Sequence, residues 1–199
     1  MKRNKVLIAV TGGIGSGKST VCDIIKAQGF TVFSCDKVYA ELLDGANLTA
    51  KIVEEFGEKI LTDGKIDRRK LSDCVFNDSV KLEKLNSITH TEIFNEIFSR
   101  AEKEEGIVFV EVPLLFEGNY QSLFDGVVVV LRKVEDRISS VVARDGLSYS
   151  DVEKRIKKQY NYDFCDYAKY YVIHNDGNID DLEQSIRQIL LKITNEFES

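Results

Sequence analysis

The sequence predicts an α/β fold: a doubly wound, mostly parallel sheet with a helical insertion and a helical lid. Short apolar runs typical of buried strands alternate with segments whose apolar residues recur at helical spacing. A glycine-rich loop separates the first such strand from the first helix, and a long block, residues 36–106, carries helical spacing almost throughout. Strands that alternate with helices of this length favour a parallel sheet covered on both faces.

Length and composition exclude several classes of protein. The 199 residues suit one domain, and with 43% hydrophobic residues the chain can bury a substantial core. Because 33 acidic residues outnumber 27 basic ones, a general nucleic-acid binder is disfavoured. No apolar run approaches the roughly 20 residues of a membrane helix, and the apolar stretch after Met1–Lys5 is too short for a signal peptide. We therefore expect a cytoplasmic protein without a nucleic-acid or membrane partner, either a monomer or a small homo-oligomer.

The cysteines argue against stabilisation by disulfides or zinc. Cys22, Cys35, Cys74 and Cys165 are scattered and form no C-x-x-C pair. We expect neither a disulfide framework nor a structural zinc site.

The first part of the chain predicts a β-α-β unit. The run Lys5–Val10 is apolar and β-branched, and helical spacing follows the glycine cluster until Gly29. Thr31–Ser34 predicts a second strand, with Asp36 at its end in the position of an N-cap for the next helix. If strand alternation continues to Asp36, Cys35 points to the opposite face and is buried.

The remaining elements complete the sheet and its helices. Further strands are expected at 107–112, 126–131 and 170–173, with helices at 134–144, 150–160 and 180–197. The predicted single domain then consists of a nucleotide-binding core (1–35, 107–131 and 168–199), a helical substrate-binding insertion (36–106) and a lid (132–167).

The strongest motif lies between the first strand and the first helix. Residues 12–19 match G-x-x-x-x-G-K-[ST] in full. Glycines let successive N–H groups turn inward, and the following helix adds its positive dipole end, so such a loop binds phosphates. Lys18 is then expected to reach the β and γ phosphates of ATP, and the Ser19 hydroxyl to bind Mg²⁺. The sheet is therefore expected to be of the P-loop NTPase type.

Other nucleotide-binding classes fit less well. The dinucleotide pattern G-x-G-x-x-G fails in both registers, and the guanine-reading N-K-x-D is absent. A small-molecule kinase remains, with the acceptor held by the helical insertion.

Acidic residues near the expected strand ends are candidates for chemistry. Asp36 could accept the proton of a substrate hydroxyl, or simply cap a helix. Glu111 resembles the acid that ends a Walker B strand. The turn Pro113–Glu117 forms either part of a substrate wall or, more simply, a cap on the core.

Basic residues offer two further sites. Asp67–Lys70 predicts a capped helix with a solvated basic face, or else a diphosphate site. Segment 132–160 is basic within an acidic chain, and Arg144 is placed like a lid arginine that stabilises a transferring phosphoryl group. Arg137 and Arg155 are next in line for that role.

The motifs together resemble the dephospho-CoA kinase family along nearly the whole chain. The residues that carry the resemblance are Thr11–Ser19, Asp36, Gly64–Leu71, Leu85-Asn86 with His90, Pro113–Glu117, Phe124-Asp125, Arg144-Asp145-Gly146, Arg155 with Gln159, and Ile173 with Asn175 and Gly177. The resemblance implies an enzyme, a phosphotransferase with an alcohol acceptor, that uses ATP and Mg²⁺ to phosphorylate the ribose 3′-hydroxyl of dephospho-CoA in the last step of coenzyme A synthesis.

The resemblance also implies roles for particular residues. Lys18, Asp36 and Arg144 would be catalytic, with Asp36 as base, and Ser19 would bind the metal. The residues expected to bind ATP are Gly12, Gly13, Ile14, Gly15, Ser16, Gly17, Lys18, Ser19, Thr20 and Asn175. Those expected to bind dephospho-CoA are Asp36, Arg68, His90, Pro113, Leu114, Leu115 and Glu117.

Some positions depart from the family pattern. Ser34 stands where the family has aspartate, Thr91 where it has proline and Ser140 where it has arginine, while Lys169-Tyr170 replaces a usual Ala-Asp. Two alternatives stay open: another small-molecule or nucleotide P-loop kinase, and a non-catalytic nucleotide-binding sensor.

Overall fold

The computed structural model describes residues 5–76, 78–162 and 166–198. By its internal contacts the chain divides into two compact units. The first contains residues 1–33 and 104–199, and the second contains residues 34–103.

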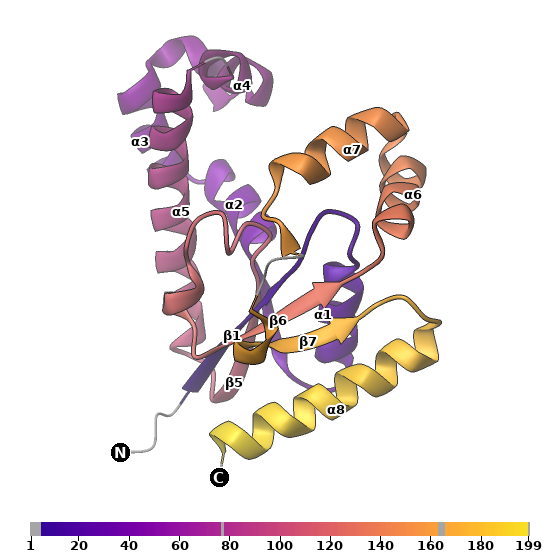
Figure 1. Cartoon of the computed structure of the whole chain (residues 1–199). Helices are drawn as coiled ribbons and strands as arrows, with labels where there is room; N and C mark the ends of the chain where they lie inside the picture. The colour runs from indigo at the N-terminus through magenta and orange to yellow at the C-terminus, as the bar shows by residue number, and fades with distance from the viewer. Residues whose placement is uncertain (1–4, 77, 163–165, 199) are drawn as a thin grey trace. The chain divides into compact units, whose positions relative to one another are not determined.

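The first unit is built on a five-stranded sheet with the order β2-β5-β1-β6-β7. Its strands are β1 (Lys5–Thr11), β2 (Thr31–Ser34), β5 (Gly106–Glu111), β6 (Gly126–Leu131) and β7 (Tyr171–His174). The central strand β1 pairs in parallel with β5 and β6, and β6 pairs in parallel with β7 (Figure 1). The predicted parallel sheet is confirmed, and the loops after β1, β5, β6 and β7 leave from the carboxyl edge, where such sheets bind ligands.

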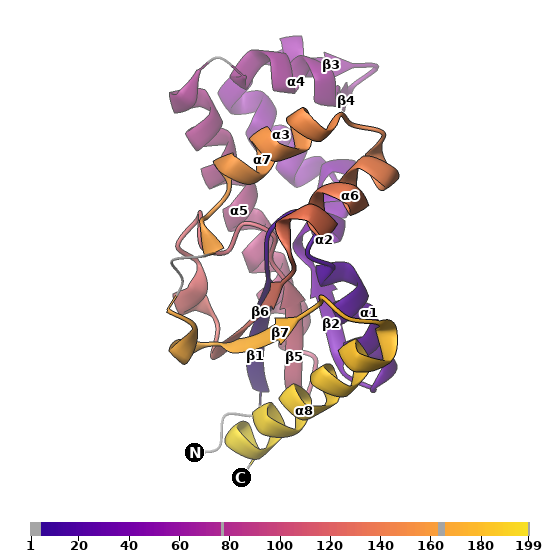
Figure 2. The same ribbon diagram turned by 45° about the vertical axis from the view of Figure 1, so that its right-hand side comes forward.

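Helices α1 (Lys18–Ala27) and α8 (Ile179–Phe197) cover one face of this sheet. Figure 2 shows them side by side, and both contribute to one apolar core with alternate residues of β1, β5, β6 and β7. In α8 the core residues follow helical spacing: Leu182, Ile186, Leu190 and Ile193. Ala9, Val108 and Val129, on the opposite face, are also fully buried. This two-sided burial explains why the strands are continuously apolar.

Two further helices, α6 (Val134–Asp145) and α7 (Tyr149–Lys158), lie within the predicted lid, and we call them the lid helices. They form a pair (orange in Figure 1) with an apolar cluster of their own, Ile138, Val141 and Val152. The turn between them begins at Gly146, which caps α6 in the left-handed conformation with φ 67°.

The second unit is helical, with α2 (Cys35–Asp44), α3 (Ala46–Phe56), α4 (Arg68–Val75) and α5 (Ser79–Ala101). Its core includes Leu48, Ile52, Phe56, Ile60, Leu71 and Val75. It also contains a hairpin absent from the prediction, β3 (Leu61–Thr62) with β4 (Lys65–Ile66). The turn residues Asp63 and Gly64 have φ of 51° and 75°, so the Asp-Gly pair was a usable signal for the hairpin.

Three short 3₁₀ turns complete the regular structure of the described chain. They span Glu58–Ile60, Gln121–Leu123 and Tyr167–Lys169.

The predicted surroundings of Asp36 are wrong in one respect. Strand β2 ends at Ser34, which is the N-cap residue of α2, so Asp36 neither ends the strand nor caps the helix. It lies in the first turn of α2 and is exposed, while Cys35 is buried, with 8% of its surface exposed. The burial of Cys35 is confirmed, but helical geometry rather than strand alternation accounts for it.

The cysteines and the lengths of the apolar helices bear on two expectations from the sequence. Among the described cysteines, Cys22, Cys35 and Cys74 form no disulfide, and Cys165 lies outside the described residues. Within residues 5–76, 78–162 and 166–198, no helix is long and apolar enough to cross a membrane.

The core of the first unit supports a stability prediction. Ile186 of α8 is fully buried, whereas Leu191 on the same helix is 65% exposed. We expect Ile186→Ala to lower the free energy of unfolding by about 2–5 kcal/mol, because it removes buried methyl groups and leaves a cavity. Leu191→Ala is the matched control, expected to change it by less than about 0.5 kcal/mol. Urea unfolding measures both, and equal effects would contradict the packing described.

Candidate phosphate-binding site

The glycine-rich loop connects the central strand to the first helix. β1 ends at Thr11, α1 begins at Lys18, and Gly17 at the helix N-cap position has φ 91°. Among the described residues, no side chain accepts a hydrogen bond from the backbone N–H groups at the start of α1. An uncapped helix N-terminus behind a glycine loop attracts phosphate through these N–H groups and the helix dipole.

Two glycines of the loop leave room for the first turn of α6. A Cβ atom on Gly13 would collide with the guanidinium of Arg137. A Cβ atom on Gly15, which has φ +76°, would lie 2.5 Å from the Arg137 carbonyl oxygen. The glycines at these positions therefore let a helix approach the loop, in addition to freeing its backbone.

Lys18 holds its ammonium over the loop. Its Nζ donates to the carbonyl oxygens of Gly12 at 2.8 Å and Gly13 at 3.1 Å. The charge therefore sits beside the same peptide groups that surround the expected phosphate position, which is where a lysine stabilises β and γ phosphates.

Ser19 is brought against Glu111, the last residue of β5. Its hydroxyl Oγ donates to Glu111 Oε1 at 3.0 Å, although the two residues lie 92 positions apart. A hydroxyl beside a carboxylate suits Mg²⁺, which prefers oxygen ligands and keeps several waters and phosphate oxygens. No group of three or more His, Cys, Asp or Glu side chains suited to a metal ion occurs among the described residues. The hydroxyl and the carboxylate therefore fit a Mg²⁺ ion that arrives with a nucleotide.

Asn175, in the loop after β7, braces the phosphate loop. Its side-chain Nδ2 donates to the carbonyl oxygen of Ser16 at 2.9 Å, and a Cβ on Gly17 would collide with the same amide. This contact supports the loop backbone. Direct contact of Asn175 with ATP stays a prediction.

A pocket of about 360 Å³ adjoins the loop at the ends of β6 and β7. It combines three basic side chains with one acidic and two phenolic ones: Arg132, Arg137, His174, Asp176, Tyr162 and Tyr167. Gly13 and Ser16 of the loop, with Val130, Leu131 and Val134, complete its lining. The pocket therefore combines apolar walls with a few polar and charged groups, as pockets for small ligands do.

Comparison with known proteins agrees with this geometry. The family model for dephospho-CoA kinase matches residues 6–181. The chain belongs to the dephospho-CoA kinase family. It is 35% identical to the dephospho-CoA kinase of Fusobacterium nucleatum over 92% of this chain and 96% of the relative. The corresponding enzyme of Carboxydothermus hydrogenoformans is 38% identical, over 94% of this chain and 93% of the relative.

Solved structures show the same fold. The structure of TT1252 from Thermus thermophilus has a TM-score of 0.84 and 31% identity. The match covers 96% of this chain and 100% of that one. The dephospho-CoA kinase from Campylobacter jejuni has a TM-score of 0.69 and 29% identity, covering 96% of this chain and 98% of that one. Shikimate kinase from Acinetobacter baumannii, at 16% identity and a TM-score of 0.53, shares the fold alone.

Arg144 lies at the end of α6, where its side chain is exposed and paired with that of Asp145. Its guanidinium donates through Nε and Nη2 to the two carboxylate oxygens of Asp145, at 2.7 and 2.9 Å. This ion pair raises the pKa of Arg144 and lowers that of Asp145. A contact between Arg144 and a transferring phosphoryl group stays a prediction.

The turn after β5 caps the core through two of its side chains, and its part in a substrate wall stays a prediction. Leu115 is fully buried and Phe116 is 6% exposed, so these two side chains cap the core. Leu114 is 45% exposed, and Glu117 accepts a hydrogen bond from the backbone N–H of Tyr160 at 2.9 Å. Glu117 thereby ties the turn to the segment that follows α7, and Phe116 packs on the Tyr160 ring, with the ring centroids 4.7 Å apart.

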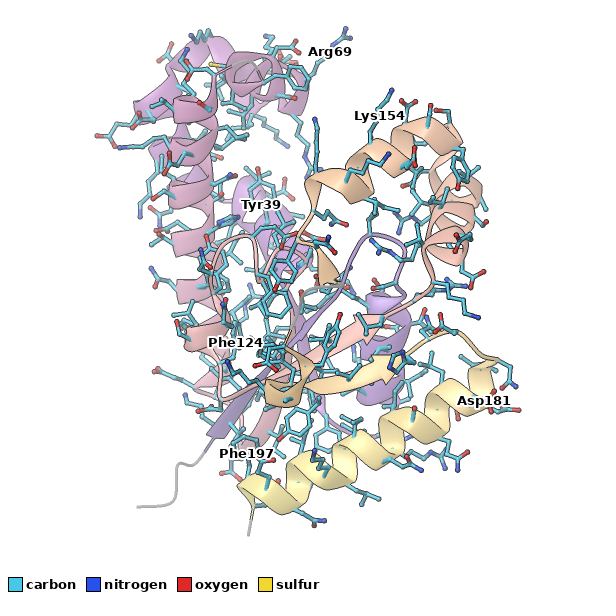
Figure 3. The ribbon with its side chains drawn as sticks, in the orientation of Figure 1. Tyr39, Arg69, Phe124, Lys154, Asp181 and Phe197 are labelled. Carbon is cyan, nitrogen blue, oxygen red and sulfur yellow. The ribbon has the colours of Figure 1, made fainter. Side chains whose placement is uncertain are left out.

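The second unit carries the expected substrate residues Arg68 and His90. Asp67 caps α4 by accepting hydrogen bonds from the backbone N–H groups of Arg69 and Lys70, as predicted, and Figure 3 shows Arg69 extending outward. Burial raises the pKa of Tyr39, and the positive charge of Arg68 opposes this increase. His90 lies in α5, where burial lowers its pKa, so its neutral form is favoured.

Arg137 and Gln159 are site residues that the sequence did not single out. Arg137 was considered only as a substitute for Arg144, and Gln159 only as part of the family resemblance. Both form hydrogen bonds with Ile14 of the phosphate loop, across 123 and 145 residues. A charged residue in the first turn of a helix gives no sign of such a contact.

The contact between Gly15 and α6 can be tested with a matched pair. Gly15 and Gly146 both have positive φ, but a Cβ on Gly146 would meet nothing within 4 Å. We expect Gly146→Ala to cost about 1–2 kcal/mol from backbone strain alone. Gly15→Ala is expected to cost about 1–3 kcal/mol more, because the added methyl group collides with the Arg137 backbone. Unfolding of the two variants measures the difference, and equal losses would show that the collision is relieved without cost.

Proposed function

We propose that this chain transfers the γ-phosphoryl group of ATP to the ribose 3′-hydroxyl of dephospho-CoA, yielding CoA and ADP. The observation that carries this proposal is the phosphate loop, in which Lys18 and the pair Ser19–Glu111 lie around one helix N-terminus in a member of the dephospho-CoA kinase family.

The loop residues supply charge stabilisation. Lys18 and the N–H groups at the start of α1 balance the negative charge that develops as the bond to the leaving β-phosphate lengthens. Ser19 and Glu111 would hold Mg²⁺, which would neutralise negative charge on the phosphates of ATP. Arg144 would give up its ion pair with Asp145 and bind the phosphoryl group during transfer. The free-energy cost of breaking the ion pair would be offset only in the transition state.

Asp36 is the proposed base. As the 3′-oxygen forms its bond to the γ-phosphorus, its proton passes to the Asp36 carboxylate, and the bond from γ-phosphorus to the bridging oxygen breaks. Two features support this role: the side chain is exposed, and it lies two residues after the carboxyl end of β2, a strand of the same sheet as β1.

The remaining assignments concern binding. The nucleoside of ATP would occupy the pocket beside Gly13 and Ser16, where arginine and tyrosine side chains can stack on a base. The residues proposed to bind dephospho-CoA are Arg68, His90, Pro113, Leu114, Leu115 and Glu117. Because Leu115 is fully buried, its contribution would be to shape the turn rather than to contact the substrate.

The activity test is ADP release with dephospho-CoA as acceptor, with Mg²⁺ present and then chelated. We expect turnover only with Mg²⁺, and a loss of at least about a hundredfold in Lys18→Ala, because one preorganised charge is removed. Turnover with a nucleoside or nucleotide but not dephospho-CoA would instead indicate another kinase. ATP binding without turnover on any acceptor would indicate a sensor.

The role of Asp36 is tested by Asp36→Asn. The amide has nearly the same shape but cannot accept the proton, so kcat should fall about 10²–10⁴-fold while ATP affinity is unchanged. Asp44→Asn makes the same change at the exposed other end of α2 and should leave both values unchanged. A loss of ATP affinity alone would identify Asp36 as a metal ligand rather than the base.

A further inference from the structure

Ile14, in the middle of the phosphate loop, is held by the lid helices through three contacts. Its backbone N–H donates to Gln159 Oε1 at 2.7 Å, at the end of α7. Its carbonyl oxygen accepts from Arg137 Nε at 2.9 Å, in the first turn of α6. Its side chain packs on the apolar cluster of the lid helices, Ile138, Val141 and Val152.

These contacts fix the peptide groups of Ile14 within a glycine-rich segment. Ile14 stands between Gly13 and Gly15, and glycine adopts far more backbone conformations than other residues. Hydrogen bonds to both the N–H and the carbonyl of Ile14 define the orientation of its two peptide planes. The adjoining peptide groups are oriented with them, and the direction of these N–H groups decides whether the loop can receive phosphate.

The donors and acceptors are also sheltered from water. Arg137 is 8% exposed, and Gln159 and Ile14 are half-buried. Hydrogen bonds in such surroundings are stronger than at a free surface, and a buried group that loses its partner carries the full cost of its lost hydration. The loop conformation therefore depends on both ends of the lid segment.

We propose that Gln159 and Arg137 are positioning residues that hold the Ile14 peptide so that the phosphate loop is organised before ATP arrives. This proposal rests on the proposed function in so far as the ligand is ATP. The contacts place the two anchors where α6 begins and α7 ends, so the base of the lid stays on the loop. Arg144, at the far end of α6, is not part of this anchoring.

Gln159 allows the sharper test because conservative changes at this half-buried position separate shape, hydrogen bonding and charge. Gln159→Met keeps the length of the side chain but removes the acceptor. Gln159→Glu keeps an acceptor for the Ile14 N–H and adds a negative charge beside the loop. Gln28→Met and Gln28→Glu make the same changes at an exposed position at the opposite end of α1.

The first measurement does not involve ATP. Hydrogen exchange of the Ile14 amide, followed by NMR in the protein without nucleotide, should be about tenfold faster in Gln159→Met than in the unmodified protein. It should be nearly unchanged in Gln159→Glu and in both Gln28 variants. An unchanged exchange rate in Gln159→Met would overturn the proposal.

The second measurement separates a positioning role from general destabilisation. Gln159→Met should weaken ATP binding about tenfold in calorimetry while kcat at saturating ATP changes less than about threefold. In Gln159→Glu the loss of affinity should diminish as the ionic strength is raised, because salt screens the repulsion between the carboxylate and the phosphates of ATP. Gln28→Glu should show no such recovery relative to the unmodified protein.

The outcomes distinguish this proposal from the proposed function. If the unmodified protein does not bind ATP, the proposed function fails, and the amide exchange still decides whether Gln159 anchors Ile14. If exchange accelerates in Gln159→Met but ATP affinity does not change, the anchor exists without a positioning role and the proposal is wrong. The proposal would also be wrong if the thermal midpoint of Gln159→Met fell so far that unfolding of the variant explained its lower ATP affinity.

Discussion

The close approach of the first turn of α6 to the phosphate loop is the contact on which the candidate site depends. Arg137 fills the space that a side chain on Gly13 would occupy, and its backbone lies against Gly15. A single helical turn thereby contributes packing, a hydrogen bond to Ile14 and a buried positive charge next to the loop. The loop motif and the lid are therefore one structural feature rather than two.

Charge is distributed unevenly in this acidic protein. The pocket beside the loop contains Arg132, Arg137 and His174 against Asp176, although the whole chain has a formal charge of −6. A locally basic site in an acidic molecule attracts a polyanion to one place and leaves the remaining surface unattractive to nucleic acids. This distribution suits a small phosphorylated substrate.

Local patterns were sufficient to predict the sheet and to locate the glycine-rich loop. The strands 5–11, 106–111 and 126–131 are apolar because both of their faces are buried, which is a property of each segment alone. The G-x-x-x-x-G-K-S loop likewise carries its chemistry within eight consecutive residues, 12–19. Glu111 was singled out from its place near the end of a strand, and in the structure the Ser19 hydroxyl donates to it.

The features of the structure that the sequence did not predict depend on residues far apart in the chain or on where a short element begins and ends. The hydrogen bonds of Ile14 link positions 123 and 145 residues apart, and no local pattern records them. The start of α2 was placed two residues too late, because Asp36 is as common in a first helical turn as at an N-cap. The hairpin at 61–66 was missed because its strands have only two residues each.

The space shared by Gly13 and Arg137 has a consequence for how such sequences can diverge. A larger residue at position 13 requires the guanidinium at position 137 to move or be replaced by a smaller side chain, since the two occupy one volume. The two positions should therefore change together among related chains. A relative with alanine at the first position and a short side chain at the second would keep the same loop, with its lid helix anchored by other means.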